Sequence, residues 1–315
     1  MVMKDIKQAL NKFLNEEIIE IKKFEAGFLS NWFKIIWKNK TYFARCLKDE
    51  YLWYLYKNED YCNFSISDKM INNAKSWIKS YWVIKYNNKS YHITDFFEWK
   101  TLSLEDINEN NIVKIADKIW QIHKNWNTNL QNLSQDNKKI LYNRSVREVI
   151  THSETVFSTY ETRIVNTKDE DFFKEYIWKM LDTYFNYVQW NYFDRISYLH
   201  GDFWQWNIMQ DKNENIAFID FSRIPYGEPG IDIWRFLAQF QIDSIINFEN
   251  KEKNDNLQTI FLENYIKITQ DRNILNHIKL WQLWVGFINL SPLLQQFLKW
   301  NKIEKDKVKN WTMSL

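Results

Sequence analysis

The stretch His200-Gly201-Asp202-Phe203-Trp204-Gln205-Trp206-Asn207, followed shortly by Ile219-Asp220-Phe221, decides how this chain is interpreted. It places two carboxylates and one amide, those of Asp202, Asp220 and Asn207, on two short apolar segments joined by a turn. Carboxylate and amide oxygens are ligands that suit Mg²⁺. A further carboxylate can orient a hydroxyl that attacks a phosphate. The set therefore predicts a site for phosphoryl transfer from ATP.

The residues around this stretch predict how the three side chains come together. An apolar run at 196–199 ends at His200, and residues 207–209 and 216–220 flank a polar turn at 211–215. Such a pattern is typical of a tight hairpin. We expect the hairpin to hold Asn207 and Asp220 near each other, facing the loop that bears Asp202. Residues 196–221 thus form a strand–loop–strand–turn–strand insertion.

The rest of the chain changes character after its first third. Two hairpins are predicted there, at 32–36 with 41–45 and at 81–86 with 90–96, preceded by an amphipathic helix at 4–23. The later helices are expected at 103–126, 135–162, 168–192, 231–248, 255–270 and 272–300. The order predicts an α+β, two-lobed fold. A small antiparallel-sheet N-terminal lobe would cover residues 1–98, and a larger, mostly helical C-terminal lobe residues 99–315.

Composition excludes several classes of protein. Hydrophobic residues make up 45% of the chain and charged residues 26%, which is typical of globular proteins. The net charge of +2 lacks the basic excess that nucleic acids or anionic membranes attract. Two cysteines, Cys46 and Cys62, are too few for a disulfide framework, and no uncharged apolar window is long enough to span a membrane. We therefore expect a soluble cytoplasmic protein without nucleic-acid or membrane partners.

The string HGDFWQWNIM, with FIDFSRIPYGEPGIDIWRF after it, resembles the Brenner-type motif and the metal-binding Asp of the aminoglycoside phosphotransferase and choline kinase family. That family has a protein-kinase-like fold. The resemblance implies Asp202 as catalytic base, Asn207 and Asp220 as Mg²⁺ ligands, and Asp232 as a support of the catalytic loop. The residues alone leave Asp232 open, because an acid at the start of a helix near 231 is common.

The same resemblance implies nucleotide-binding residues in the first lobe. Arg45 stands where the family carries a Lys or Arg that binds phosphates, and Lys48 is the alternative. Glu50 would be the carboxylate partner of that cation, although it could also be part of a surface ion pair.

Two segments of the first lobe resemble the family's loop and hinge. Residues 27–31 are similar to the phosphate-covering loop, which implies that Ser30 and Asn31 approach the phosphates. Residues 95–99 are similar to the interlobe hinge, where the backbone at Phe97 would meet the adenine edge.

Tryptophan is abundant where glycine is expected. The chain has 5 Gly and 17 Trp, whereas average usage predicts roughly 22 Gly. Trp99, Trp206 and Trp234 stand at positions where the resemblance leads us to expect glycine. We hypothesise that the source reads UGA as glycine; UGG codons at the three positions would refute this. If the chain carries Trp206, we expect its large ring to overpack the loop at a cost of about 1–3 kcal/mol. The protein would then be a poor kinase, and Trp206→Gly should restore its activity.

The function implied by the resemblance is an ATP- and Mg²⁺-dependent transfer of the γ-phosphate to a hydroxyl of a small molecule. Choline, ethanolamine, homoserine, a sugar, an aminoglycoside or another antibiotic all stay open as acceptors. The alternative is a non-catalytic kinase-like binding or spore-coat-type protein. Either a monomer or a homodimer is compatible with the sequence.

Overall fold

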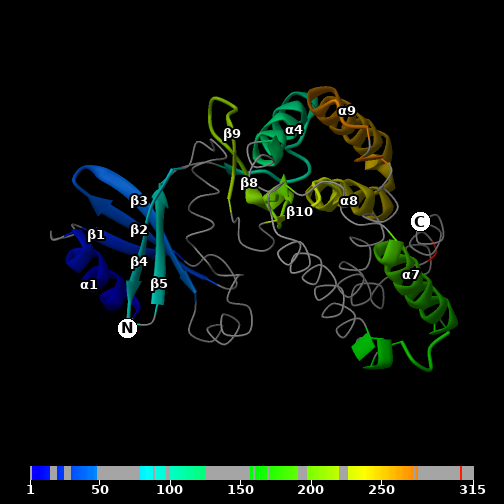
Figure 1. Cartoon of the computed structure of the whole chain (residues 1–315), viewed down its shortest axis with the longest axis horizontal. Coiled ribbons are helices and arrows are strands. Elements are labelled where there is room, and N and C mark those ends of the chain that lie inside the picture. Colours follow the sequence, from blue (N-terminus) through cyan, green and yellow to red (C-terminus); the bar gives the residue numbers. More distant parts are fainter. Residues whose placement is uncertain are drawn as a thin grey trace. The chain divides into compact units, whose positions relative to one another are not determined.

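The computed structural model divides the chain into two units (Figure 1). Unit 1 comprises Met1–Leu102, His200–Asp202 and Trp206–Pro225; unit 2 comprises Ser103–Leu199, Phe203–Gln205 and Tyr226–Leu315. The predicted lobe boundary between residues 98 and 99 stays a prediction. The residues that the structure describes are 2–14, 20–24, 30–47, 79–87, 89–96, 100–124, 157–158, 160–162, 164–168, 170–190, 197–219, 226–272, 274–275 and 306.

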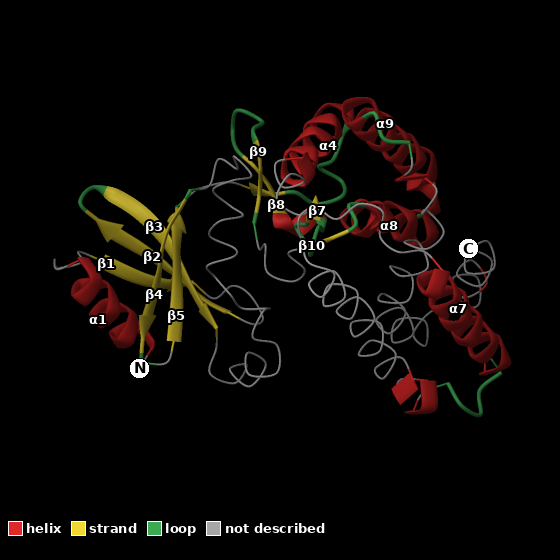
Figure 2. Ribbon diagram, viewed as in Figure 1, coloured by secondary structure: helices red, strands yellow, loops and turns green. Residues whose placement is uncertain are grey.

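Within the described residues, unit 1 contains a five-stranded antiparallel sheet in the order β1-β2-β3-β5-β4 (Figure 2). Its strands are β1 (Glu20–Phe24), β2 (Ser30–Trp37), β3 (Lys40–Leu47), β4 (Ser80–Tyr86) and β5 (Lys89–Asp95). Both predicted hairpins are confirmed. The β2–β3 turn uses Lys38 and Asn39, both with positive φ, as a two-residue hairpin turn requires.

Helix α1 (Val2–Leu14) is shorter than predicted, because residues 20–24 form strand β1. The run Ile18-Ile19-Glu20-Ile21 is rich in β-branched residues, which favour strands, and pairing with β2 completes that preference. Ile6, Ala9 and Leu10 of α1 are buried in the hydrophobic core that covers one face of the sheet. Full burial of each large aliphatic side chain contributes roughly 1.5–3 kcal/mol.

The predicted strand–loop–strand–turn–strand insertion is confirmed. Strand β7 (Ser197–Tyr198) pairs with β10 (Tyr226–Gly227). After the single 3₁₀ turn η2 (Gln205–Asn207), β8 (Ile208–Gln210) pairs with β9 (Ile216–Phe218). The sequence did not predict β6 (Lys100–Thr101), which joins the other edge of β8.

Unit 2 is mostly helical in the part of the chain that the structure describes. Its helices include α4 (Glu109–Lys124), α7 (Glu170–Trp190), α8 (Gly230–Ile246) and α9 (Lys251–Thr269). They correspond to four of the predicted helices. Those predicted at 135–162 and 272–300 lie almost entirely outside the described residues. Among the described residues, no helix combines the length and apolarity needed to cross a membrane.

Helix α4 begins later than predicted because Asn108 caps it. The Oδ1 of Asn108 accepts the backbone N–H groups of Asn110 and Asn111, at 3.0 and 3.1 Å. Asn111 Oδ1 in turn accepts the backbone N–H of Asn108 at 2.8 Å. This reciprocal arrangement is the amide version of a capping box. Ser103, where the predicted helix begins, instead forms a preceding hydrogen-bonded turn with Asp106.

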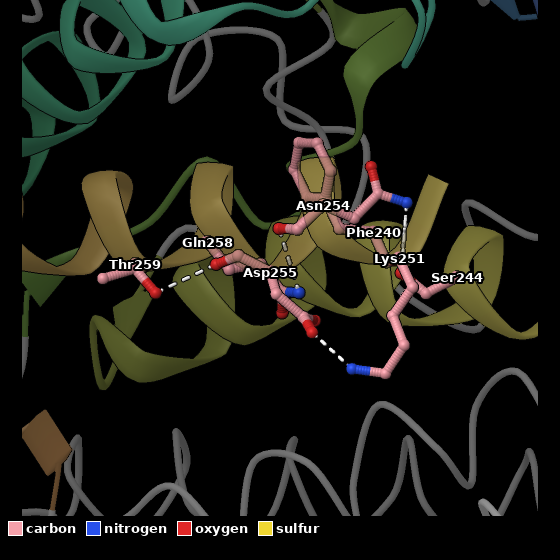
Figure 3. A network of polar contacts seen from close by, with 7 residues as sticks. All are labelled: Phe240, Ser244, Lys251, Asn254, Asp255, Gln258 and Thr259. Carbon is pink, nitrogen blue, oxygen red and sulfur yellow. Dashed lines mark hydrogen bonds and ion pairs between the residues drawn. The ribbon is translucent and has the colours of Figure 1, made fainter. Parts of the chain in front are cut away.

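Helices α8 and α9 are joined by a buried amide (Figure 3). The Nδ2 of Asn254 on α9 lies 3.3 Å from the Phe240 carbonyl oxygen, 3.1 Å from Ser244 Oγ and 2.8 Å from Asp243 Oδ2. The same Asp243 accepts hydrogen bonds from Asn247 and Asn250. Because a buried polar group without partners costs about 1–3 kcal/mol, this network stabilises the α8–α9 pair.

Candidate active site

The candidate site is built on the loop at residues 200–207, which begins with a turn that requires glycine. Gly201 has φ 79°, a left-handed conformation that costs glycine little and other residues more. The buried His200 accepts the backbone N–H of Asp202 through Nδ1 at 3.3 Å. Its ring packs edge-on against Phe218 of β9, with centroids 5.9 Å apart. His200 therefore orients the start of the loop.

The loop is closed by a contact between Asp202 and Asn207. The Asn207 Nδ2 donates to the backbone carbonyl of Asp202 at 2.7 Å and lies 3.4 Å from its Oδ2. Asn207 is buried, whereas Asp202 is half-buried. Because Nδ2 is the donor, Oδ1 is the amide atom able to coordinate a cation. The structure thus brings together two of the three residues predicted to form the site.

Asp220, the third predicted residue, lies outside the described residues. It directly follows Ile219, whose backbone N–H donates to the Asn207 carbonyl at 2.9 Å. An amide oxygen and carboxylates are hard donors of the kind that Mg²⁺ prefers, so the donor set fits this ion. Among the described residues, no group of three or more His, Cys, Asp or Glu side chains is placed to hold a metal.

The expectation that Trp206 overpacks the loop is wrong. Its side chain is 52% exposed, and its φ is not in the left-handed region. No packing strain therefore supports a gain in activity from Trp206→Gly. Trp234, in contrast, is 3% exposed within α8, and among the described residues its indole N–H has no hydrogen-bond partner. Trp99 lies outside the described residues.

Asp232 lies in the first turn of α8 and is fully buried. Its Oδ2 is 3.1 Å from Nε2 of His123 on α4, and His123 Nδ1 is 2.7 Å from the Tyr265 hydroxyl on α9. An imidazole protonated on Nε2 would donate to Asp232 and accept from Tyr265. Asp232 is therefore more than an acid at a helix start, because it links α8 to α4 and, through His123, to α9.

Two of the predicted nucleotide-binding residues, Asn31 and Arg45, lie on different faces of the sheet. Arg45 pairs with Trp32 across β2 and β3, and its guanidinium lies 5.4 Å from the centre of the Trp32 ring. Asn31 pairs with Cys46, so alternation places its side chain on the opposite face. The structure therefore does not bring the Asn31 and Arg45 side chains together. Ser30 begins β2, whereas Lys48, Glu50 and Phe97 lie outside the described residues.

One neighbour of Arg45 was not identified from the sequence. His92 on β5 is buried and stands opposite Arg45 in the strand register. Burial, and secondly the charge of Arg45, lower the pKa of His92 to about 3. The imidazole is therefore neutral near pH 7. No local motif marks His92, because only the β3–β5 pairing sets its environment.

Comparison with known proteins gives a family match over a part of the chain that contains loop 200–207. Residues 157–256, which include this loop, match the phosphotransferase enzyme family. The predicted resemblance is confirmed. No match was found among curated proteins.

Solved structures extend the likeness to nearly the whole chain. The ethanolamine kinase of Plasmodium vivax has a TM-score of 0.57 at 19% identity, covering 93% of this chain and 81% of its own. The choline kinase LicA of Streptococcus pneumoniae has a TM-score of 0.56 at 12% identity, covering 99% and 98%. A thermostable mutant of aminoglycoside phosphotransferase APH(4)-Ia, complexed with ADP and hygromycin B, has a TM-score of 0.53 at 12% identity, covering 98% and 96%. The α+β, protein-kinase-like fold predicted from the sequence is confirmed.

Proposed function

We propose that this protein is an ATP- and Mg²⁺-dependent phosphotransferase that transfers the γ-phosphate to a hydroxyl of a small molecule. The observation that carries the proposal is the closed loop 200–207. The Asn207 side-chain amide donates a hydrogen bond to the Asp202 backbone carbonyl, and Asp202 itself is half-buried. The phosphotransferase family match over residues 157–256 and the kinase-like fold support the same conclusion.

Each residue of the site has a role that follows from its chemistry. The Asp202 carboxylate accepts the proton of the acceptor hydroxyl. The oxygen of that hydroxyl bonds to the γ-phosphorus of ATP, and the bond from the γ-phosphorus to ADP breaks. Asn207, through Oδ1, and Asp220 would hold Mg²⁺, which neutralises charge on the phosphates when bound. Arg45 is the candidate cation for the phosphates. Its burial against Trp32 supports this role, because a cation on that sheet face is already desolvated and oriented.

The acceptor belongs to one of the small-molecule classes used by proteins of similar fold. Those include an ethanolamine kinase, a choline kinase and an aminoglycoside phosphotransferase bound to hygromycin B. Amino alcohols and aminoglycosides, together with the sugars that the sequence left open, form the panel to be screened.

The test is acceptor-dependent ADP release. Purified protein is mixed with ATP, Mg²⁺ and each member of the panel, and the phosphorylated acceptor is identified by mass spectrometry. We expect one acceptor class to give ADP and phospho-acceptor in equal amounts, with the reaction stopped by EDTA and restored by excess Mg²⁺. Binding of MgATP without transfer to any acceptor would contradict the proposal and favour a non-catalytic kinase-like binding protein.

A further inference from the structure

The middle of loop 200–207 rests on helix α8. Phe203 packs against Phe236, with ring centroids 4.9 Å apart. The guanidinium of Arg235 lies 5.8 Å from the centre of the Trp204 ring. Both contacts hold the segment on the helix, but apolar and cation–π contacts tolerate small slides and rotations. A directional interaction, such as a hydrogen bond, is needed to set the orientation of the loop backbone.

Gln239 supplies a directional contact one turn further along α8. Its Oε1 accepts the backbone N–H of Gln205 at 3.2 Å, and its Nε2 lies 3.2 Å from the Arg235 carbonyl oxygen as a donor. The side chain is only 5% exposed. The bond to Arg235 determines which amide atom faces the loop. Gln239 therefore presents an acceptor, already oriented, to one peptide N–H.

The Gln205 N–H that Gln239 binds lies between the two candidate site residues in the chain. Gln205 stands three residues after Asp202 and two before Asn207, inside the ring that the Asn207-to-Asp202 hydrogen bond closes. A hydrogen bond weakens steeply when its geometry is distorted. Holding the Gln205 peptide plane therefore limits the rotations available to the backbone on both sides.

We propose that Gln239 is a positioning residue for phosphoryl transfer, acting through the Gln205 backbone to hold Asp202 and Asn207 in place. The inference rests on the proposed function. It adds a residue outside the HGD and IDF motifs, in a stretch of α8 where every residue from 231 to 240 is buried. A buried amide among apolar residues is expected to have a specific partner.

The test replaces Gln239 with Met, which has a similar volume but no oxygen acceptor. Displacing a reacting group by ~1 Å can cost about 100-fold in rate. We expect kcat of Gln239→Met to fall roughly 10–100-fold, with the KM for ATP changing less than about twofold. Ser244→Ala is the matched control, because Ser244 also makes a buried hydrogen bond on α8, to the Phe240 carbonyl, without touching the loop.

Hydrogen exchange separates positioning from general weakening of the fold. The Gln205 amide should exchange faster in Gln239→Met, whereas Ser244→Ala should leave it protected. Wild-type kcat in Gln239→Met, or unchanged exchange at Gln205, would overturn the proposal. If Gln239→Met does not fold, Gln239→Glu keeps an acceptor oxygen and should keep Gln205 protected; rapid exchange there would overturn it equally.

The hydrogen-exchange experiment does not depend on enzymatic turnover. The proposed function and the positioning role of Gln239 can therefore be refuted independently of each other. A wild-type protein that transfers phosphate to no acceptor would refute the proposed function. The Gln239 contact would still be judged by whether the Gln205 amide depends on it for protection.

Discussion

Loop 200–207 and the α8–α9 network use the same side chains, aspartate and asparagine, in opposite ways. In the network, Asp243 accepts hydrogen bonds from three asparagine amides, those of Asn247, Asn250 and Asn254. In the loop, the Asn207 amide gives its short bond to the backbone of Asp202 and reaches the carboxylate only at 3.4 Å. The Asp243 carboxylate thus accepts hydrogen bonds from three side chains, whereas the short bond at Asp202 goes to its backbone carbonyl.

The difference suggests how structural and functional acids can be told apart. Asp243 resembles the buried Asp232 in having a carboxylate held by side-chain donors from other turns or helices. Such acids stabilise packing, because removing one partner leaves the other unsatisfied. Asp202 is instead positioned by hydrogen bonds to its backbone, from Asn207 Nδ2 to its carbonyl and from its N–H to His200 Nδ1. Substituting these aspartates should separate loss of activity from loss of stability.

The largest effect is expected for Asp202→Asn. General-base groups typically contribute about 10²–10⁴-fold, so acceptor-dependent ADP release should fall by that factor. The free energy of unfolding should change by no more than ~0.5 kcal/mol, as for most part-exposed positions. Steady-state kinetics and urea unfolding measure the two quantities. Retention of wild-type kcat would show that the loop carboxylate is not the base.

A loss of stability is expected for His123→Leu. The substitution removes one hydrogen-bond partner of Asp232 and one of the Tyr265 hydroxyl in a fully buried site, which should cost about 1–3 kcal/mol. Urea unfolding measures the loss, and Lys124→Ala, on the exposed side of the same helical turn, is the control. Equal unfolding midpoints for wild type and His123→Leu would mean that the buried triad contributes nothing.

A smaller, pH-dependent effect is expected at Asp243. Burial acts to raise its pKa, but the hydrogen bonds from Asn254, Asn247 and Asn250, helped by the charge of Lys253, outweigh burial and lower the pKa below 3.8. The unfolded chain then binds the proton more tightly than the folded one, so stability rises with pH. The contribution is complete above the unfolded pKa and is lost as pH falls through the folded pKa. Acid titration of Asp243→Asn should show a shallower loss of stability than wild type; identical acid profiles would contradict this.

The smallest effect is expected for Asp255→Asn. Asp255 forms an i,i+4 ion pair with Lys251 on α9, and both side chains are about half exposed. Pairs of this kind contribute roughly 0.3–0.5 kcal/mol and are screened by salt. Urea unfolding at low and high salt should show a small difference that vanishes in high salt. A cost above 1 kcal/mol would mean that surface pairs matter here as much as buried ones.

Much of the fold was predictable because its signals are local. Both hairpins, the insertion at 196–221 and helices α7 and α8 lie close to their predicted bounds. The errors have physical reasons. The sequence places β1 in a helix because its pairing with β2 is not visible along the chain. It predicts α4 to begin at Ser103, but Ser103 forms a turn with Asp106, and the helix begins only after the Asn108 cap.

The site was predictable where its residues are neighbours in the chain. Asp202 and Asn207 come together as expected, and the family match supports the motif. The predicted crowding by Trp206 failed, because side-chain exposure depends on which surfaces surround the loop. Asn31 and Arg45 are each predicted to approach the phosphates, yet the strand register places their side chains on opposite faces of the sheet.

The sequence by itself determined the local make-up of loop 200–207: a glycine turn, one acid and one amide in a fixed order. These depend on residues within a few positions of one another, where spacing limits geometry strongly. Only the tertiary structure decided the partners of Gln205, Asp232 and Tyr265, which lie 34, 109 and 142 residues away along the chain. Such contacts arise from the packing of helices, because no spacing in the sequence fixes which buried polar groups will meet.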